Sequence, residues 1–406
     1  MNNLVLTNIK QLIGITDNSN EVKKGSSQGQ VHTLDNAYLI IRDGIIHDFG
    51  PMNECPSTEL TTHDCAQKLV MPMYVDSHTH LVFAKSRSDE MKMRLHGKSY
   101  QEIAEAGGGI LNSAKRLHEM SEQELYDDAH VRLEQVIKNG TGAIEIKSGY
   151  GLNIEDEMKM LRVIRVLKQL SPIPIKSTFL GAHAIPEEFK NNKAAYMYLV
   201  CNEMLPRIAG ENLADFIDIF CETGYFDLDD LRQIIEAGYQ YGIKAKVHVN
   251  QFSSFGAVQL ACSHGALSVD HLEVMNEEDY VALESSNTIA TALPLCSMFL
   301  DIPYTPAKQL IQRNIPVAVA SDFNPGSAPS SNLNLAFALA CSQMKLTPEE
   351  AFNGLTYNAA FAMDVQDEVG SIQIGKKANL IITKPANGLE DIPYWFGENR
   401  ISSVIV

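Results

Sequence analysis

Met71-Pro-Met-Tyr-Val-Asp-Ser-His-Thr-His80 is a short apolar run that ends in two histidines one residue apart. Side chains alternate between the two faces of a β-strand, so in a strand His78 and His80 point the same way, about 6.6 Å apart. Two imidazoles at this spacing can converge on one metal ion, and a catalytic ion needs further ligands from elsewhere in the chain. The alternative is that both histidines are polar residues of a turn.

Across the middle of the chain, apolar runs rich in β-branched residues alternate with amphipathic stretches. The strand candidates are Val70–Asp76, Gly142–Lys147, Ile175–Gly181, Phe216–Cys221, Lys244–Val249, Leu267–His271, Thr288–Ala292 and Val317–Asp322. The helical candidates are Glu122–Asn139, Glu155–Leu170, Pro186–Ile208, Asp227–Tyr241 and Glu277–Ser285. Eight strands that alternate with helices predict a (β/α)₈ TIM-like barrel, which we assign to residues 71–364.

The two ends of the chain show a different pattern from the middle. Short β-like runs broken by turns fill residues 3–70, and similar runs return in Gly370–Thr383 and Ile401–Val406. We therefore expect residues 1–70 plus 365–406 to form one small β-sandwich domain built from both termini.

The amino-acid composition disfavours some classes of binding partner and indicates a cellular compartment. With 33 Lys and Arg against 50 Asp and Glu, the formal net charge is −17, which disfavours nucleic acid and anionic membrane surfaces. The 7 cysteines are scattered and include no Cys-x-x-Cys pair, a pattern typical of reduced thiols in the cytosol. No signal peptide is evident and no apolar run approaches about 18 residues, so we expect a soluble, cytoplasmic protein. The oligomeric state is left open, with a homodimer as one option.

Polar and ionisable residues collect where the predicted strands end, which is where barrels of this kind carry their active sites. These residues are His78 and His80, Lys147, His183, Glu222, His248, His271 and Asp322. His248 and Asp322 would project towards the barrel axis and share one ion with His78 and His80. Three imidazoles and one carboxylate suit zinc or ferrous iron, and water on such an ion becomes a hydroxide nucleophile near neutral pH.

This arrangement resembles the amidohydrolase superfamily, in which a strand-one His-x-His, a strand-five His, a strand-six His and a strand-eight Asp surround the metal. Members with two metals typically add a carboxylated lysine at the end of strand four. Here that strand reads Asp218-Ile-Phe-Cys-Glu-Thr-Gly224, without a lysine. The resemblance therefore implies one zinc or iron ion per chain.

Two further segments narrow the resemblance to one branch of that superfamily. Lys147-Ser-Gly-Tyr-Gly-Leu152 and Asp322-Phe-Asn-Pro-Gly-Ser327 look like the loops of enzymes that open a five-membered cyclic amide during histidine degradation. The branch implies a small-molecule substrate, imidazolone propionate, and hydrolysis of 4-imidazolone-5-propanoate to N-formimidoyl-L-glutamate by a metal-bound hydroxide.

The same resemblance implies which side chains touch the substrate. Arg87 matches a carboxylate clamp, and its planar guanidinium can bind a carboxylate through two hydrogen bonds. The other substrate candidates are Tyr150, His183, Gln251, Asn324, Gly326 and Ser327. Tyr150 could instead be a core tyrosine, and His183 a buried histidine whose hydrogen bonds are all made. Asn324, Gly326 and Ser327 could form an ordinary turn. Lys147, Tyr100 and Gly107–Gly109 are expected to shape the first loops.

The proton-transfer group has three candidates. Related deaminases place a glutamate three residues after the strand-five ligand, where this chain has Gln251, and an amide cannot take a proton. His271 is therefore the preferred acid-base group, with Glu222 as an alternative relay or supporting residue, and Gln251 is kept as a candidate for catalysis as well as binding. The competing functions are a cyclic-amidine deaminase, which Gln251 disfavours, and a catalytically inactive scaffold, which the complete ligand set disfavours.

Overall fold

A computed structural model describes residues 3–17, 21–99, 102–103 and 106–406. Its centre is a sheet of 8 strands in sequence order, with every neighbouring pair parallel. The strands are β6 (Tyr74–Asp76), β7 (Thr141–Lys147), β8 (Ile175–Ala182), β9 (Phe216–Cys221), β10 (Lys244–Val249), β11 (Ser268–His271), β12 (Ile289–Ala292) and β13 (Val317–Val319).

The sheet closes on itself at the end where the site was expected. A parallel bridge joins Thr79 to Phe323, just after the first and last strands. The His80 N–H donates to the Phe323 carbonyl at 2.8 Å, and the Asp322 N–H donates to the His78 carbonyl at 3.0 Å. The predicted (β/α)₈ barrel is confirmed, and its closure brings the two ends of the ligand set together.

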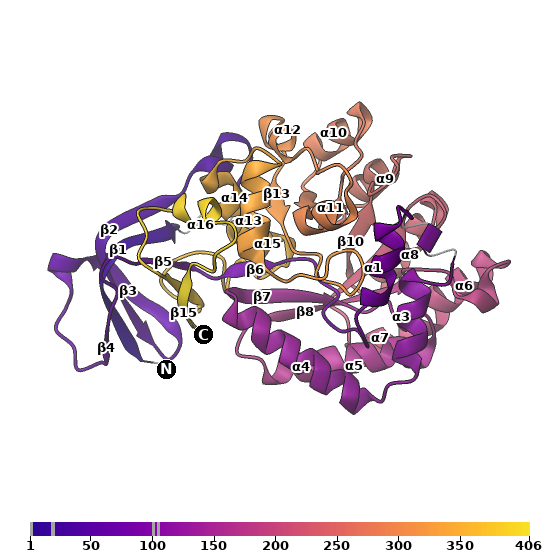
Figure 1. Cartoon of the computed structure of the whole chain (residues 1–406), viewed down its shortest axis with the longest axis horizontal. Coiled ribbons are helices and arrows are strands. Elements are labelled where there is room, and N and C mark those ends of the chain that lie inside the picture. Colours follow the sequence, from indigo (N-terminus) through magenta and orange to yellow (C-terminus); the bar gives the residue numbers. More distant parts are fainter. Residues whose placement is uncertain (1–2, 18–20, 100–101, 104–105) are drawn as a thin grey trace.

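Helices cover the outside of the barrel (Figure 1). The longer ones are α3 (Gly109–His118), α4 (Glu122–Lys138), α5 (Ile154–Leu170), α8 (Leu228–Gln240), α10 (Glu277–Glu284), α13 (Leu333–Ser342) and α14 (Pro348–Leu355). Shorter ones are α1 (Met91–Leu95), α6 (Lys193–Leu199), α7 (Leu205–Gly210), α9 (Ala257–Ser263), α11 (Pro294–Leu300), α12 (Ala307–Gln312), α15 (Tyr357–Ala362) and α16 (Asp391–Tyr394). Among the described residues, no helix is both long and apolar enough to cross a membrane.

The predicted helix over Pro186–Ile208 is broken, which the pattern did not anticipate. Asn192 caps the first turn of α6 by accepting from the Ala195 N–H, so the helix begins late. A π-helical turn over Val200–Met204 then separates α6 from α7. Pro206 lies in the first turn of α7, where its missing N–H removes one α-helical hydrogen bond and favours the wider turn before it.

Both ends of the chain contribute to a second sheet, which lies beside the barrel (Figure 1). Its 7 strands are β1 (Leu4–Ile15), β2 (His32–Arg42), β3 (Ile45–Pro51), β4 (Thr62–Asp64), β5 (Leu69–Pro72), β14 (Leu380–Thr383) and β15 (Ile401–Ile405). Buried side chains from both ends, such as Leu6, Leu39 and Leu380, pack together on it. The domain boundaries at 70/71 and 364/365 stay a prediction.

The predicted strand Val70–Asp76 is in fact two strands in two different sheets. β5 pairs with β1 and β14, whereas β6 pairs with β7. Pro72 has no N–H to continue the first ladder. The Met73 N–H then donates to Asn379 of the terminal segment, and the Tyr74 N–H donates to Gly140 beside the barrel, both at 2.9 Å. The chain therefore changes sheets at Met73, seven residues before His80.

Candidate active site

Four ligand atoms converge at the closed end of the barrel. His248 Nε2 lies 3.3 Å from His80 Nε2, and Asp322 Oδ1 lies 3.5 Å from His78 Nε2 and 3.6 Å from His80 Nε2. An ion with four bonds of about 2.0–2.1 Å in tetrahedral directions holds its ligand atoms about 3.4 Å apart. The His78 Nε2 is buried without a hydrogen-bond partner among the described residues. The four predicted ligands thus fit one small divalent ion.

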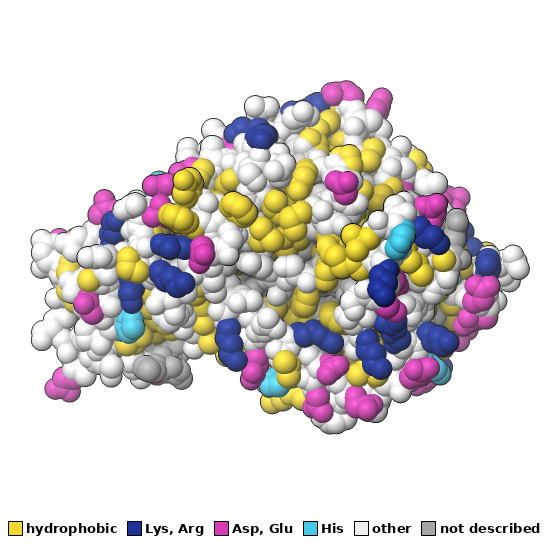
Figure 2. Space-filling model, in the orientation of Figure 1, with side chains coloured by type: hydrophobic (Ala, Val, Ile, Leu, Met, Phe, Trp, Pro, Cys, Tyr) yellow, Lys and Arg dark blue, Asp and Glu magenta, His cyan; other side chains and the backbone are white. Residues whose placement is uncertain are grey.

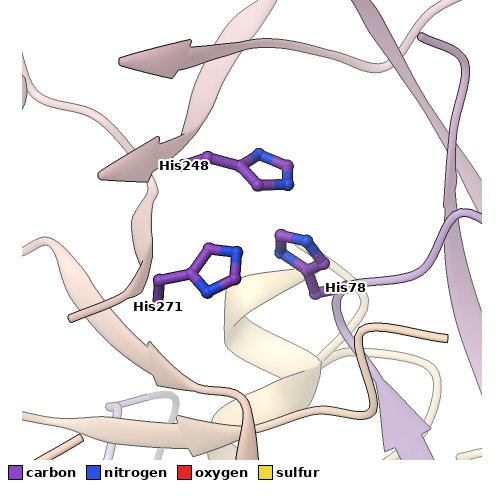
Figure 3. Close-up of side chains that lie close together, drawn as sticks. All are labelled: His78, His248 and His271. Carbon is purple, nitrogen blue, oxygen red and sulfur yellow. The ribbon is translucent and has the colours of Figure 1, made fainter. Parts of the chain in front are cut away.

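His271 belongs to the same cluster. Ligand atoms of His78, His248 and His271 all lie within 4.8 Å of one another. Figure 3 shows the three rings turned towards one another, His248 and His271 from neighbouring strands and His78 from the opposite side. His271 is therefore close enough either to bind the ion or to act on a molecule held beside it.

Two buried carboxylates orient two of the predicted ligand histidines. Asp270 Oδ2 accepts from His78 Nδ1 and Asp218 Oδ2 accepts from His248 Nδ1, both at 2.7 Å. With Nδ1 occupied, the Nε2 atom of each ring faces the ion site, as is usual for histidine ligands of metals. Sequence reasoning did not assign a role to either aspartate. Their position inside predicted buried strands was the available signal, because an ionisable side chain there must find a partner.

Burial keeps the ligand histidines neutral. Removal from water lowers the pKa of His78, His80 and His248 well below the usual value, and the charge of Lys147 lowers the pKa of His78 and His248 further. A neutral imidazole has the free lone pair that a metal needs. Burial also raises the pKa of Asp322 to about 6, although the charge of His271 opposes the rise.

A pocket opens above the ligand atoms. It is lined by His80, Arg87, Ile110, Tyr150, His183, Phe220, His248, Gln251, His271, Asp322, Asn324 and Ser327. The lining includes ten of the predicted site residues. His78 is buried beneath it, and Glu222 and Gly326 do not line it. Ile110 and Phe220 are additions that polar-residue reasoning missed, because apolar walls leave no distinctive signal in a single sequence.

Arg87 is a buried cation in the wall of this pocket, 4% exposed. Its backbone N–H donates to the Pro325 carbonyl at 3.1 Å, and its Nε lies 3.9 Å from a Glu90 carboxylate oxygen. The guanidinium lies directly against Gly326, where an added Cβ would be 1.3 Å from Nη2. Only glycine leaves room for this side chain, so Gly326 acts by shaping the place of Arg87.

Asn324 builds the loop that brings Gly326 to Arg87. Its Oδ1 accepts from the N–H groups of Gly326 and Ser327 at 2.8 and 2.7 Å. Its Nδ2 donates to the Asp322 carbonyl and to the Ser327 hydroxyl, each at 2.7 Å. The Asn-Pro-Gly-Ser segment is thus a self-supporting turn whose side chains also line the pocket, and the turn and binding interpretations are compatible.

Glu222 ties two loops together. Its carboxylate accepts from the N–H groups of Thr223 and Phe252 at 2.8 Å and of Ser253 at 3.2 Å, and from the Ser253 hydroxyl. This fixes the loop after β10, in which Gln251 donates from Nε2 to the Cys296 sulfur at 3.4 Å. Both Glu222 oxygens are already engaged, and none of their partners lines the pocket.

Comparison with known proteins now identifies the family. The sequence profile described as "Amidohydrolase family" matches residues 69–406. This chain belongs to the amidohydrolase family. Within that family it is 50% identical over 403 residues to the imidazolonepropionase of Flavobacterium johnsoniae and 51% identical over 404 residues to that of Christiangramia forsetii. Each alignment covers 99% of this chain and 98% of the relative, which places the chain among the imidazolonepropionases.

Solved structures share the fold of this chain at much lower identity. The guanine deaminase of E. coli matches with a TM-score of 0.73 and 14% identity, over 99% of this chain and 98% of that one. The 5-methylcytosine deaminase of Klebsiella pneumoniae, liganded with 5-fluorocytosine, matches with a TM-score of 0.72 and 15% identity, over 97% and 95%. At this identity the likeness supports the fold alone.

The environment of His271 differs from that of the other histidines in this site. Its Nδ1 lies 3.2 Å from Glu273 Oε1. Burial opposes protonation, but the charges of Glu273, Asp322 and Asp270 outweigh it, so the pKa of His271 is raised. The backbone at His271 and Leu272 has φ values of 89° and 65°, a strained conformation for residues with side chains. This conformation lies at the end of β11, where the His271 side chain joins the cluster with His78 and His248.

His183 and Tyr150 form one side of the pocket. The His183 ring stacks on His80 with centroids 5.1 Å apart, and its Nδ1 lies 2.8 Å from the Gly149 carbonyl. Burial lowers the pKa of His183 to about 4, so the ring is neutral near pH 7. The Tyr150 ring lies 5.4 Å from His183 and 5.9 Å from His80.

Apolar side chains form a groove between α1 and α11 on the face where the loops gather, including Met91, Leu95, Met298 and Phe299. Figure 2 shows hydrophobic side chains gathered over this part of the molecule, with acidic and basic side chains interspersed around it.

Of the residues expected to shape the first loops, Tyr100 lies outside the described residues.

Proposed function

We propose that this chain hydrolyses the cyclic amide of 4-imidazolone-5-propanoate to N-formimidoyl-L-glutamate. The observation that carries the proposal is one pocket that contains both a metal-ligand set and a buried arginine. The substrate has the matching parts: a ring carbonyl to be attacked and a propionate carboxylate to be held. The near-complete alignment with imidazolonepropionases supports the same reaction.

The metal site is part of the proposal. We assign one zinc or iron ion to His78, His80, His248 and Asp322, because their ligand atoms are spaced as one small ion requires. When bound, an ion of this kind supplies a Lewis acid and a water of lowered pKa. One ion is favoured over two because the end of β9, at Cys221 and Glu222, offers no lysine to bridge a pair.

The chain's own residues would bind and orient the substrate. Arg87 is proposed to hold the propionate carboxylate through two charge-assisted hydrogen bonds. Tyr150 and His183 would flank the ring, and Asn324 and Ser327 would contact it from the loop after β13. Holding the carboxylate at Arg87 would restrict the orientations in which the ring carbonyl faces the ion.

Proton transfer is proposed for His271. The departing ring nitrogen must gain a proton, and His271 has a raised pKa and lies within the ligand cluster. Gln251 cannot titrate, so its proposed part is a hydrogen bond to the substrate. Glu222 is engaged by the amides of Thr223, Phe252 and Ser253, which supports a role in fixing the Gln251 loop.

The decisive experiment is turnover of imidazolone propionate combined with metal analysis of the same purified sample. We expect ring opening in proportion to the metal content, close to one equivalent of zinc or iron per chain at full activity. Activity that persists after complete chelation, or metal-loaded protein that fails to open the ring, would contradict the proposal.

The location of the protein and its oligomeric state are also proposed. All 7 cysteines are free thiols, which supports a reducing compartment such as the cytoplasm. A homodimer is proposed as one form of the enzyme in solution, and light scattering on the purified protein tests it.

A further inference from the structure

Lys147 is a fully buried cation at the end of β7. Its Nζ lies 2.9 Å from Glu145 Oε1, 2.9 Å from Asp218 Oδ2 and 4.0 Å from Asp270 Oδ2. One ammonium group therefore contacts carboxylates from three different strands: β7, β9 and β11. Such a buried cluster persists only when its members are well paired.

The oxygens that face Lys147 are also the oxygens that hold the ligand histidines. Asp218 Oδ2 accepts from His248 Nδ1, and Asp270 Oδ2 accepts from His78 Nδ1, both at 2.7 Å. Each of these oxygens thus lies between one imidazole and the single ammonium group. The two histidines come from opposite sides of the barrel, and Lys147 is the group their supports share.

We propose that Lys147 is a positioning residue that holds Asp218 and Asp270, and through them His248 and His78, in the geometry that binds one metal ion. The inference rests on the metal site of the proposed function and adds to it a residue that touches neither metal nor substrate. It assigns to one lysine the joint alignment of two ligands that are 170 positions apart in the chain.

The physical reason is the repulsion between buried carboxylates. Asp218 and Asp270 carry like charges in an interior where charges are screened far less than in water. The ammonium group between them offsets that repulsion and leaves each carboxylate one orientation. Without it, the two side chains would turn apart or towards other donors, such as the Ser268 hydroxyl that already donates to Asp270 Oδ1 at 2.6 Å. The histidines would then lose their fixed rotation.

The barrel contains a matched control. Lys246 on β10 is equally buried, but its Nζ donates to the Ser268 hydroxyl and the Ala362 carbonyl, both at 2.8 Å. Lys246→Met removes the same charge from the same interior without removing a direct contact to either oxygen that holds a histidine; its hydrogen-bonded link to them runs through Ser268 to the other oxygen of Asp270. A comparison with Lys147→Met therefore separates the loss of a buried charge from the loss of alignment.

The test measures metal affinity by competition with a chelator, together with the visible spectrum of the cobalt(II) form. Supporting residues of metal ligands typically contribute 10- to 100-fold in affinity. We expect Lys147→Met to bind zinc roughly 10- to 100-fold more weakly than Lys246→Met, with an altered cobalt spectrum, because the positions of the ligands change. Equal affinities and unchanged spectra in folded Lys147→Met would overturn the inference.

A second variant covers the case in which Lys147→Met does not fold. The double variant Lys147→Met/Asp218→Asn removes the ammonium and one carboxylate together, so no extra buried charge is left. Because Lys147 also contacts Asp270, its replacement should weaken zinc binding in the Asp218→Asn background and should have no further effect in the Asp218→Asn/Asp270→Asn background. A loss of the same size in both backgrounds would overturn the inference. Neither measurement requires substrate, so a failure of the proposed reaction and a failure of this inference are distinguishable.

Discussion

Replacement of Gly326 by alanine tests the carboxylate clamp without touching a charged group. The added Cβ would lie 1.3 Å from Arg87 Nη2, 1.9 Å from Cζ and 2.2 Å from Nε. Carbon atoms in contact are normally about 3.5 Å or more apart, so the guanidinium must move by about 2 Å. A displacement of that size is incompatible with two hydrogen bonds of about 2.7–2.9 Å to one carboxylate.

The expected cost follows from the bonds that are lost. A hydrogen bond to a charged group contributes about 1.5–3 kcal/mol, which corresponds to a rise in KM for imidazolone propionate of roughly 10- to 150-fold. Arg87→Lys should show a loss in the same range, because lysine keeps the charge but lacks the planar fork. Steady-state kinetics of Gly326→Ala, Arg87→Lys and the double variant measure it, and we expect the double variant to lose little more than either single one.

The control is Gly210→Ala in α7. An added Cβ there meets no atom within 4 Å, and the position has no left-handed backbone. Its KM should stay within about twofold of the unchanged chain, since surface substitutions of this kind cost little. A KM for Gly326→Ala that also stays within twofold, in protein with full metal content, would refute both the proposed clamp and the part that Gly326 plays in it.

Three further predictions concern the histidines. His248→Ala should lose most of its bound zinc or iron, because three donors remain of four; atomic absorption with full metal retention would contradict the assigned site. His271→Asn should keep its metal while kcat falls about 10²- to 10⁴-fold, the usual contribution of general acid-base catalysis; metal loss would make His271 a ligand instead. The third prediction concerns the free energy of unfolding of the protein after a chelator has removed its metal. Folded His183 has a pKa of about 4 against 6.5 when unfolded, so the unfolded chain takes up the proton first and stability falls as pH drops through this window. Between pH 6.5 and 4, urea titrations should show the unchanged chain losing up to about 3 kcal/mol more than His183→Gln, and equal slopes would contradict the burial of a neutral ring.

The barrel was predictable because its signal is local and repeated. Strands buried on both faces are rich in apolar residues, and β9 and β10 occupy the predicted ranges Phe216–Cys221 and Lys244–Val249. The last strand is shorter than predicted: β13 ends at Val319, and Asp322 already has a φ of 54°. Chain direction there is set by closure against Thr79, a contact made across the whole barrel that no window of sequence contains.

The supports of the site were harder to predict than its ligands. His78 and His248 stand at strand ends, where the barrel places its chemistry. Asp218 and Asp270 lie inside strands, and which histidine each one holds depends on the order of strands around the barrel. The orientation of a loop side chain is equally hidden, since Glu222 follows β9 much as His183 follows β8, yet its carboxylate turns to the amides of the next loop.

The change of sheet at Met73 has a consequence for synthesis and truncation of the chain. β5 forms one ladder with β1, made shortly before it, and another with β14, which leaves the ribosome roughly 300 residues later, a long wait for a non-local contact. Until then, one edge of β5 has no partner strand, and β5 comes directly before the strand that leads to His78. A nascent or clipped chain that stops before Leu380 would keep that edge open as a template for pairing with other molecules. Such chains should therefore aggregate, and the last strands serve as much to protect the protein from its own copies as to stabilise it.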